Sequence, residues 1–260
     1  MKTNTTSITP KQLEILLLLY RFRFLNRIQI QKLLNHKNAN RINPWLKDLT
    51  EKELIGRIYS KRIGENIKPA IYYLAVKSRH ILKDQKECIE PMLKHVYREQ
   101  SRLATFRSHC MLVADTYFYF QALIKGEQKT LDFQTKVEYA NQDFLLKPLP
   151  DAFIAIKAPR KKTKRYFLEI FDEGVPRFAI RYRIKQYIEY FDDDDWQNNT
   201  NYPNPKILLI CPNELTQRFI QRFINKALED ACALEPVFLV TSKDKLALKT
   251  EDIWLQVETE

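Results

Sequence analysis

The chain has 260 residues, of which 45% are hydrophobic, and it carries a net charge of +11. That length suits one large domain or two small ones. It contains no long uncharged apolar run and no secretory pattern at its N-terminus, so we expect a cytoplasmic protein without a membrane partner. Its four cysteines are scattered without a C-x-x-C pair, which indicates neither a disulfide framework nor a zinc site (Cys88, Cys110, Cys211 and Cys232).

The positive charge is concentrated near the N-terminus. Residues 1–100 contain 20 Lys and Arg against 9 Asp and Glu, whereas the rest of the chain contains 23 of each. This asymmetry favours a nucleic-acid-binding module in the first part of the chain. Anionic membranes and acidic proteins also attract basic domains, so charge alone leaves those alternatives open.

Residues 1–90 are predicted to form a winged helix-turn-helix domain. Thr9 followed by Pro10 begins one helix, and Asn26 caps a second. A third helix is expected from about Asn38 to Thr50, with Pro44 either kinking it or lying in its first turn. Two strands follow, at 54–59 and 70–75, joined by a polar and basic loop that contains Gly64 and forms the wing.

The third helix is the predicted DNA-reading element because the corresponding helix of such folds enters the major groove. Asn and Arg side chains can bond base edges bidentately, and Lys binds phosphates. The outward residues of the helix are Asn38, Asn40, Arg41, Asn43 and Lys47, and the wing adds Lys61, Arg62 and Lys68. Winged helices also serve as protein-interaction modules, and polar exposed helix faces are ordinary.

Residues 91–260 are expected to form an α/β domain. The predicted order is a long helical stretch or two between 96 and 125, then strands at 131–139, 149–157 and 166–172. A helix at 176–191, a buried strand at 206–211, a helix at 214–231 and strands at 236–241 and 253–257 complete it. The acidic run 192–195 is predicted to be a solvated loop.

The strands at 149–157 and 166–172 are joined by a charged, proline-containing loop and predict a hairpin. A pairing centred on position 160 places Asp151 opposite Glu169 on the same face. Two such carboxylates repel unless a cation lies between them, and Mg²⁺ or Mn²⁺ is the expected cofactor. The alternative is a half-buried hairpin whose acidic residues lie at the solvent-exposed ends of the strands.

The predicted αβββαβ order resembles the PD-(D/E)XK nuclease core. Pro150 and Asp151 match the first half of its motif, and Glu169 matches the acidic position on the next strand. The Lys expected two residues later is replaced by Phe171. The resemblance implies that this Lys can migrate to the following helix, which makes Lys185 the candidate catalytic lysine; the alternative places Lys185 in a solvated charged stripe.

The whole arrangement resembles the replication-relaxation family of plasmids and integrative elements, which includes relaxase-type mobilisation proteins. The resemblance runs to about Cys211 and depends on short motifs in order: Ile71-Tyr-Tyr-Leu74, Ser108-His-Cys-Met-Leu-Val-Ala-Asp115, Leu149-Pro-Asp-Ala152, Phe167-Leu-Glu-Ile170, Asp172-Glu-Gly174 and Arg183-Ile-Lys-Gln-Tyr187. Members usually place an acid two residues after the strand Glu. Here Phe171 stands there and Asp172 follows, which leaves the second ligand open.

Two functions follow from this resemblance. The first is a DNA-binding protein of plasmid or mobile-element replication or mobilisation that nicks or relaxes double-stranded DNA with a metal held by Asp151 and Glu169, assisted by Lys185. The second is a non-enzymatic DNA-binding regulator whose nuclease-like domain is a degenerate scaffold. Other replication or mobilisation proteins and a second copy of the chain are possible partners in either case.

Overall fold

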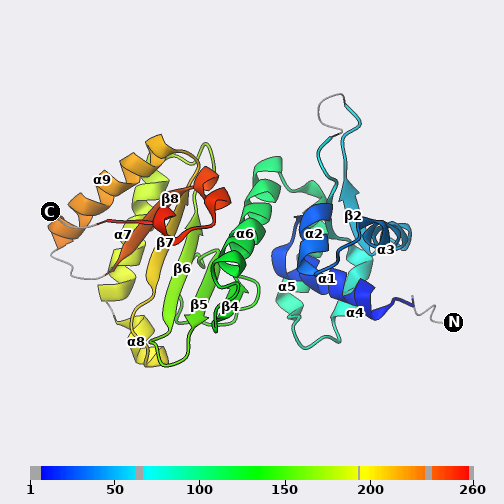
Figure 1. The fold of residues 1–260 in the computed structure, drawn as a ribbon, viewed down its shortest axis with the longest axis horizontal. Coiled ribbons are helices and arrows are strands. Elements are labelled where there is room, and N and C mark those ends of the chain that lie inside the picture. The colour runs from blue at the N-terminus through cyan, green and yellow to red at the C-terminus, as the bar shows by residue number, and fades with distance from the viewer. Residues whose placement is uncertain (1–6, 63–66, 193, 232–235, 258–260) are drawn as a thin grey trace. The chain divides into compact units, whose positions relative to one another are not determined.

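A computed structural model describes residues 7–62, 67–192, 194–231 and 236–257 of the chain (Figure 1). Gly64 and Cys232 lie outside these residues. The chain separates into two compact units, Met1–Ala114 and Asp115–Glu260. Residues 91–114 thus group with the first unit. Compactness does not show which segment folds by itself, so the predicted boundary after residue 90 stays a prediction.

The first unit begins with three helices, as expected. They are α1 (Pro10–Phe22), α2 (Arg27–Leu33) and α3 (Ala39–Glu51). Thr9 and Asn26 each form a capping box with a glutamine three residues on, which satisfies backbone amides that a helix start leaves without partners. Pro44 lies inside α3, beyond its first turn.

The three helices are followed by an antiparallel hairpin of β2 (Ile55–Ile58) and β3 (Ile71–Leu74). The short strand β1 (Leu25–Asn26), which the sequence did not predict, pairs with β3 and gives the sheet order β1-β3-β2. Helices α4 (Arg79–Leu82) and α5 (Glu90–Lys94) complete the unit with the first part of α6 (Ala104–Leu123).

Apolar residues hold the first unit together. Ile15, Leu16 and Leu19 of α1 and Ile42, Leu46 and Leu49 of α3 are buried. Phe24, Tyr73 and Cys110 form a separate buried cluster. Within the hairpin Gly56 faces Tyr73 across the strands, and a Cβ at Gly56 would overlap the tyrosine ring. The glycine is therefore required by close approach of the ring.

The second unit is a mixed α+β fold with a six-stranded sheet in the order β4-β5-β6-β7-β8-β9. Its strands are β4 (Thr130–Thr135), β5 (Ala152–Lys157), β6 (Lys164–Ile170), β7 (Lys206–Cys211), β8 (Phe238–Ser242) and β9 (Leu255–Gln256). Strands β6, β7 and β8 are parallel, and the other pairs are antiparallel.

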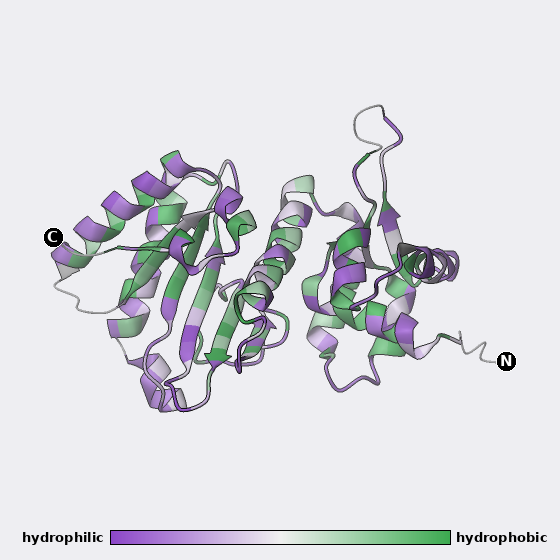
Figure 2. Cartoon of the chain, viewed as in Figure 1, coloured by the Kyte–Doolittle hydropathy of each residue, from purple (hydrophilic) through white to green (hydrophobic). Residues whose placement is uncertain are grey.

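Helices cover both faces of this sheet. Helix α6 lies on the face that contains Tyr166, against which Phe120 packs. Helices α7 (Arg177–Asp192) and α9 (Glu214–Ala231) lie on the other face, where Tyr187 reaches Glu169 (Figure 1). The central strands between these layers are largely hydrophobic, while α9 alternates polar and apolar residues (Figure 2), as expected of a helix with one buried side.

The helical stretch expected between 96 and 125 as one segment or two is two segments, a 3-10 helix (Val96–Ser101) and α6. Two other parts of the chain differ from the prediction. Strand β4 ends at Thr135, and the chain turns before Tyr139 instead of continuing extended. A short helix, α8 (Asp195–Thr200), begins at the end of the acidic run. Among the described residues, no helix is both long and apolar enough to cross a membrane.

Candidate functional site

The first candidate site is a groove of about 930 Å³ between α3 and the β2–β3 hairpin, which we call the α3–hairpin groove. Its polar and basic lining comes from α2, α3 and both sides of the hairpin: Arg27, Asn40, Asn43, Lys47, Thr50, Arg57, Tyr59, Lys68 and Tyr72. Glu51 is the one acidic residue among the described lining residues. The groove therefore has a positive potential and amide side chains able to donate and accept hydrogen bonds.

The cations of this groove are held loosely. Lys47 approaches Glu51 at 3.7 Å, but its side chain is 77% exposed, so the pair is weak and Lys47 can exchange it for another anion. The Arg57 guanidinium lies 4.9 Å from the centre of the Tyr59 ring, which orients it without neutralising it. These side chains are available to an anionic partner.

The structure brings Asn40, Asn43, Lys47 and Lys68 together in this groove. Arg41, Lys61 and Arg62 are exposed but do not line it. The predicted outward residue Asn38 has another role, since its side chain caps α3 by accepting a hydrogen bond from the Asn40 amide at 2.8 Å.

Sequence reasoning missed Arg27, Arg57 and Tyr59. The signal for Arg57 and Tyr59 was their alternation with Ile58 in the strand, which puts both on the face opposite a partly buried residue.

The second candidate site lies at the end of the β5–β6 hairpin. Ala152 pairs with Leu168, Phe153 with Phe167 and Ile154 with Tyr166, which is the predicted register. The printed pairing ends at Ala152, and the Asp151 amide donates to the carbonyl of Leu168, the partner of Ala152, at 2.8 Å, so the backbone is shifted by one residue there. Asp151 therefore lies just beyond the paired strands, close enough to Glu169 for the two charges to interact, and their direct opposition across the hairpin stays a prediction.

Both carboxylates have protein cations and donors around them. Asp151 is only 3% exposed; its Oδ1 accepts from Lys136 Nζ at 2.5 Å and its Oδ2 from the Ile170 amide at 2.9 Å. Glu169 Oε2 accepts from Arg183 Nε and Nη2 at 2.9 and 2.7 Å and from the Tyr187 hydroxyl at 2.8 Å. We call these residues, with Tyr139, the carboxylate cluster. The Tyr139 hydroxyl donates to the Pro150 carbonyl.

The charges in the cluster influence one another. Burial raises the pKa of Glu169; the Arg183 guanidinium opposes that shift and the negative charge of Asp151 adds to it. Burial also raises the pKa of the Tyr139 phenol, and Asp151 and Glu169 raise it further. The Tyr187 hydroxyl has its pKa raised well above its usual range by burial and then by Glu169. The two carboxylates are thus electrostatically coupled, and each has a cation beside it.

A comparison with known families places the chain. The replication-relaxation family model matches residues 16–204, nearly three quarters of the sequence. The chain belongs to the replication-relaxation family. Among solved structures it is similar to the restriction endonuclease FokI, with 12% identity and a TM-score of 0.34, over 92% of this chain and 43% of that one. The chain thus spans less than half of that endonuclease. No curated protein matches the chain significantly.

In this replication-relaxation protein, Lys185 does not lie beside the carboxylates of Asp151 and Glu169. Lys185 is exposed and lines a groove with Phe223, Lys226 and Asp230 of α9. The residues four apart on the same stripe, Arg177, Arg181 and Glu189, are exposed as well. The basic groups beside Asp151 and Glu169 are Lys136 and Arg183 instead.

The donor set of the replication-relaxation protein does not fit a ready-made metal site. Both oxygens of Asp151 accept from protein donors, and the two negative charges are balanced by Lys136 and Arg183. Metal ligation requires free carboxylate oxygens, and a divalent ion would bring its own charge into a cluster that is already neutral. No group of three or more His, Cys, Asp or Glu among the described residues is arranged to hold a metal ion.

Lys136, Arg183 and Tyr187 were not predicted as partners of the carboxylates. Arg183 and Tyr187 are four residues apart and so share one face of a helix, which was a readable signal once the register of the hairpin was known. Lys136 had no such signal, because the sequence predicts a strand where the chain turns.

Proposed function

We propose that this protein of the replication-relaxation family binds double-stranded DNA during replication or mobilisation of a plasmid or mobile element. Its first unit would do so as a winged helix-turn-helix domain. The observation that carries the proposal is the α3–hairpin groove, in which Asn40, Asn43 and Lys47 of α3 face Arg57 and Lys68 of the hairpin. Other replication or mobilisation proteins and a second copy of the chain are the further partners that we propose.

The chemistry of the α3–hairpin groove suits a duplex. Helix α3 would enter the major groove with its amide side chains and Arg41 toward base edges, since Asn pairs bidentately with adenine and Arg with guanine. Lys47, Arg57 and Lys68 would contact phosphates and set the orientation of the helix. The wing, with Lys61 and Arg62, would reach the adjacent backbone or minor groove.

Fluorescence anisotropy with a labelled duplex taken from the DNA beside the protein's own gene tests the proposal. The variant Lys47→Glu/Lys68→Glu should lose at least about tenfold in affinity, because two phosphate contacts become repulsive. The matched control is Lys83→Glu/Lys86→Glu, which changes the charge of the same unit equally at exposed residues outside the groove. Equal losses in both variants would show that the groove is not the interface.

A second candidate function is metal-dependent nicking of DNA by a nuclease-like second unit. The electrostatic interaction between Asp151 and Glu169, at the end of the paired β5 and β6 strands, favours it. The pairing of these carboxylates with Lys136 and Arg183 favours the alternative, a degenerate nuclease scaffold that serves a non-enzymatic regulator. Conversion of supercoiled plasmid to open circles with Mg²⁺ or Mn²⁺ but not with EDTA, and its loss in Asp151→Asn, would establish nicking; no conversion would leave the regulator.

A further inference from the structure

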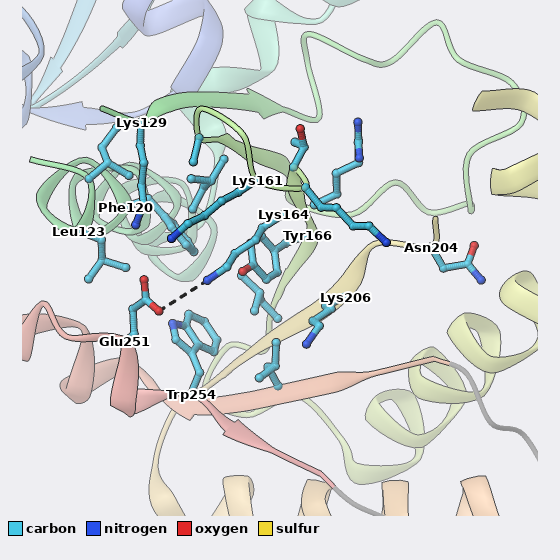
Figure 3. A pocket seen from close by; sticks show the side chains of 18 residues that line it. Phe120, Leu123, Lys129, Lys161, Lys164, Tyr166, Asn204, Lys206, Glu251 and Trp254 are labelled. Atoms are coloured by element: carbon cyan, nitrogen blue, oxygen red, sulfur yellow. Dashed lines mark ion pairs between the residues drawn. The ribbon is translucent and has the colours of Figure 1, made fainter. Parts of the chain in front are cut away.

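The second unit contains a basic groove on the α6 face of its sheet, which we call the lysine groove. Its volume is about 490 Å³, and it lies between the end of α6, the β5–β6 loop and the segment that leads into β9. Five of its lining residues are lysines, Lys129, Lys161, Lys162, Lys164 and Lys206, and Arg165 also borders it, with its guanidinium 3.8 Å from the centre of the Tyr202 ring. Figure 3 shows the amino groups of Lys129, Lys161 and Lys164 directed into the same space.

Acidic residues neutralise little of this charge. Glu251 is the one acid among the described lining residues, and it pairs with Lys164 at 3.7 Å between side chains that are about 60% exposed. Lys129 also pairs with Glu127, beside the groove. The exposed Lys164–Glu251 pair is weak and exchanges readily, so the groove is a region of positive potential in a unit whose net charge, with the groove included, is close to neutral.

Aromatic rings form the floor of the groove. Phe120, Tyr166 and Trp254 line it together, and Phe120 and Tyr166 lie with ring centres 6.2 Å apart. The indole of Trp254 is held in place, since its Nε1 donates to the Tyr119 hydroxyl at 2.8 Å and that hydroxyl donates to the Thr250 carbonyl at 2.6 Å. A ring fixed in this way loses little conformational entropy when a planar ligand stacks on it.

The lysine groove is separate from the carboxylate cluster. Side chains alternate between the two faces of a strand, so Lys164 and Tyr166 lie on the α6 face of β6 while Glu169 lies on the α7 face. Lys164 and Glu169 are also about 17 Å apart along β6, at roughly 3.3 Å per residue. One ligand molecule of small size cannot occupy both sites.

From this combination we propose that the lysine groove binds single-stranded nucleic acid. The lysines follow the phosphate backbone, and Trp254 and Tyr166 provide faces on which unpaired bases stack. A duplex cannot use these rings because its bases are already stacked and shielded by pairing. The groove is distinct from the α3–hairpin groove, so the proposal does not depend on duplex binding by the first unit.

The test measures binding of a fluorescein-labelled 20-nucleotide oligothymidylate, as DNA and as RNA, to the full chain. We expect Lys161→Glu/Lys162→Glu to lose about tenfold or more in affinity and to reduce the slope of log K against log salt by about 1.4, at roughly 0.7 per lost phosphate contact. Both side chains are exposed and lie in a loop, so the fold should be retained. The matched control, Arg222→Glu/Lys226→Glu on the exposed side of α9, should bind as the wild type does.

Two further measurements decide the role of the rings and of the first unit. An oligonucleotide with abasic sites in place of its bases should bind wild type about tenfold more weakly, because it keeps the phosphates and loses the stacking. Lys47→Glu/Lys68→Glu, which alters the α3–hairpin groove, should leave single-strand binding unchanged. The proposal is overturned if Lys161→Glu/Lys162→Glu and Arg222→Glu/Lys226→Glu lose affinity equally, or if the abasic strand binds as well as the intact one. It is also overturned if polyglutamate displaces the oligonucleotide at equal charge, because the partner would then be an acidic protein surface.

Discussion

At the scale of single residues, Lys136 decides the charge of the carboxylate cluster. It is the cation beside Oδ1 of the buried Asp151. We expect Lys136→Met to lower the free energy of unfolding by about 1–3 kcal/mol, since a buried carboxylate loses a charged donor. Urea denaturation measures this, with Lys157→Met, an exposed lysine on the same hairpin, as the control that should stay within about 0.5 kcal/mol.

The same Lys136→Met variant tests whether a cation can replace the lysine. Without Lys136 the cluster has a net negative charge, so millimolar Mn²⁺ should raise the melting temperature of Lys136→Met more than that of the wild type. If Mn²⁺ leaves both melting temperatures unchanged, Asp151 and Glu169 do not bind the metal even when the amino group of Lys136 is absent.

Tyr119 determines part of the stability at alkaline pH. Burial raises its pKa to about 12. An acid whose pKa is raised by folding contributes stability that is complete below its unfolded value, near 10 for tyrosine, and that is lost as the pH rises toward 12. We therefore expect the melting temperature to fall between pH 10 and pH 12, and to fall less steeply in Tyr119→Phe.

The matched control for Tyr119→Phe is Tyr182→Phe, at a ring that is 65% exposed. This variant should follow the wild-type curve. At pH 7 Tyr119→Phe should itself be less stable by about 1–3 kcal/mol, because Trp254 Nε1 and the Thr250 carbonyl lose their partner. If the melting temperatures of the wild type and of Tyr119→Phe fall in parallel with pH, Tyr119 does not cause the loss of stability between pH 10 and pH 12.

At the scale of elements, we expect Arg41 of α3 to contact bases and Lys47 of the same helix to contact phosphates. Arg41→Ala should relax the sequence preference, at a cost of about 1–3 kcal/mol at its base pair. Lys47→Ala should weaken binding to every duplex alike, because a phosphate contact has no sequence information. Competition between duplexes that differ at one base pair separates these effects, and identical behaviour of the two variants would contradict the placement of α3.

The β2–β3 hairpin depends on the absence of a side chain at Gly56. A Cβ there would overlap the ring of Tyr73, which packs with Phe24 and Cys110. Gly56→Ala should therefore lower the stability of the first unit by about 1–3 kcal/mol. It should also weaken duplex binding, since Arg57 is the next residue in the strand. An unchanged unfolding curve for Gly56→Ala would mean that the Tyr73 ring can move away from the new methyl group without lowering the stability of the unit.

At the scale of the whole molecule, the positive charge and its place predict salt dependence. Residues 1–114 carry 22 Lys and Arg against 9 Asp and Glu, which leaves the second unit close to neutral. If Arg27, Lys47, Arg57 and Lys68 all meet phosphates, log K for a duplex should fall against log salt with a slope of about −3 to −4. Affinity that does not change between 50 and 200 mM salt, roughly the range over which counterion release is evident, would argue against phosphate contacts.

What the sequence could predict was local. The caps at Thr9 and Asn26 depend on residues three positions apart, and the register of β5 and β6 depends on the loop that joins them, so both were readable without a fold. The exposed polar face of α3 followed from helical periodicity. Family membership followed from short motifs in order, and the match over residues 16–204 confirms it.

Tertiary structure alone decided which charges meet. Lys185 and Arg183 are two residues apart, which turns their side chains by about 200° around the helix, so only the packing of α7 on the sheet determined that Arg183 and not Lys185 reaches Glu169. Lys136 reaches Asp151 because β4 ends early and the chain turns there. The lysine groove gathers residues from α6, the β5–β6 loop, β7 and the segment before β9. Local patterns are set by covalent neighbours, whereas these contacts depend on how separate elements pack, and no spacing along the chain encodes that.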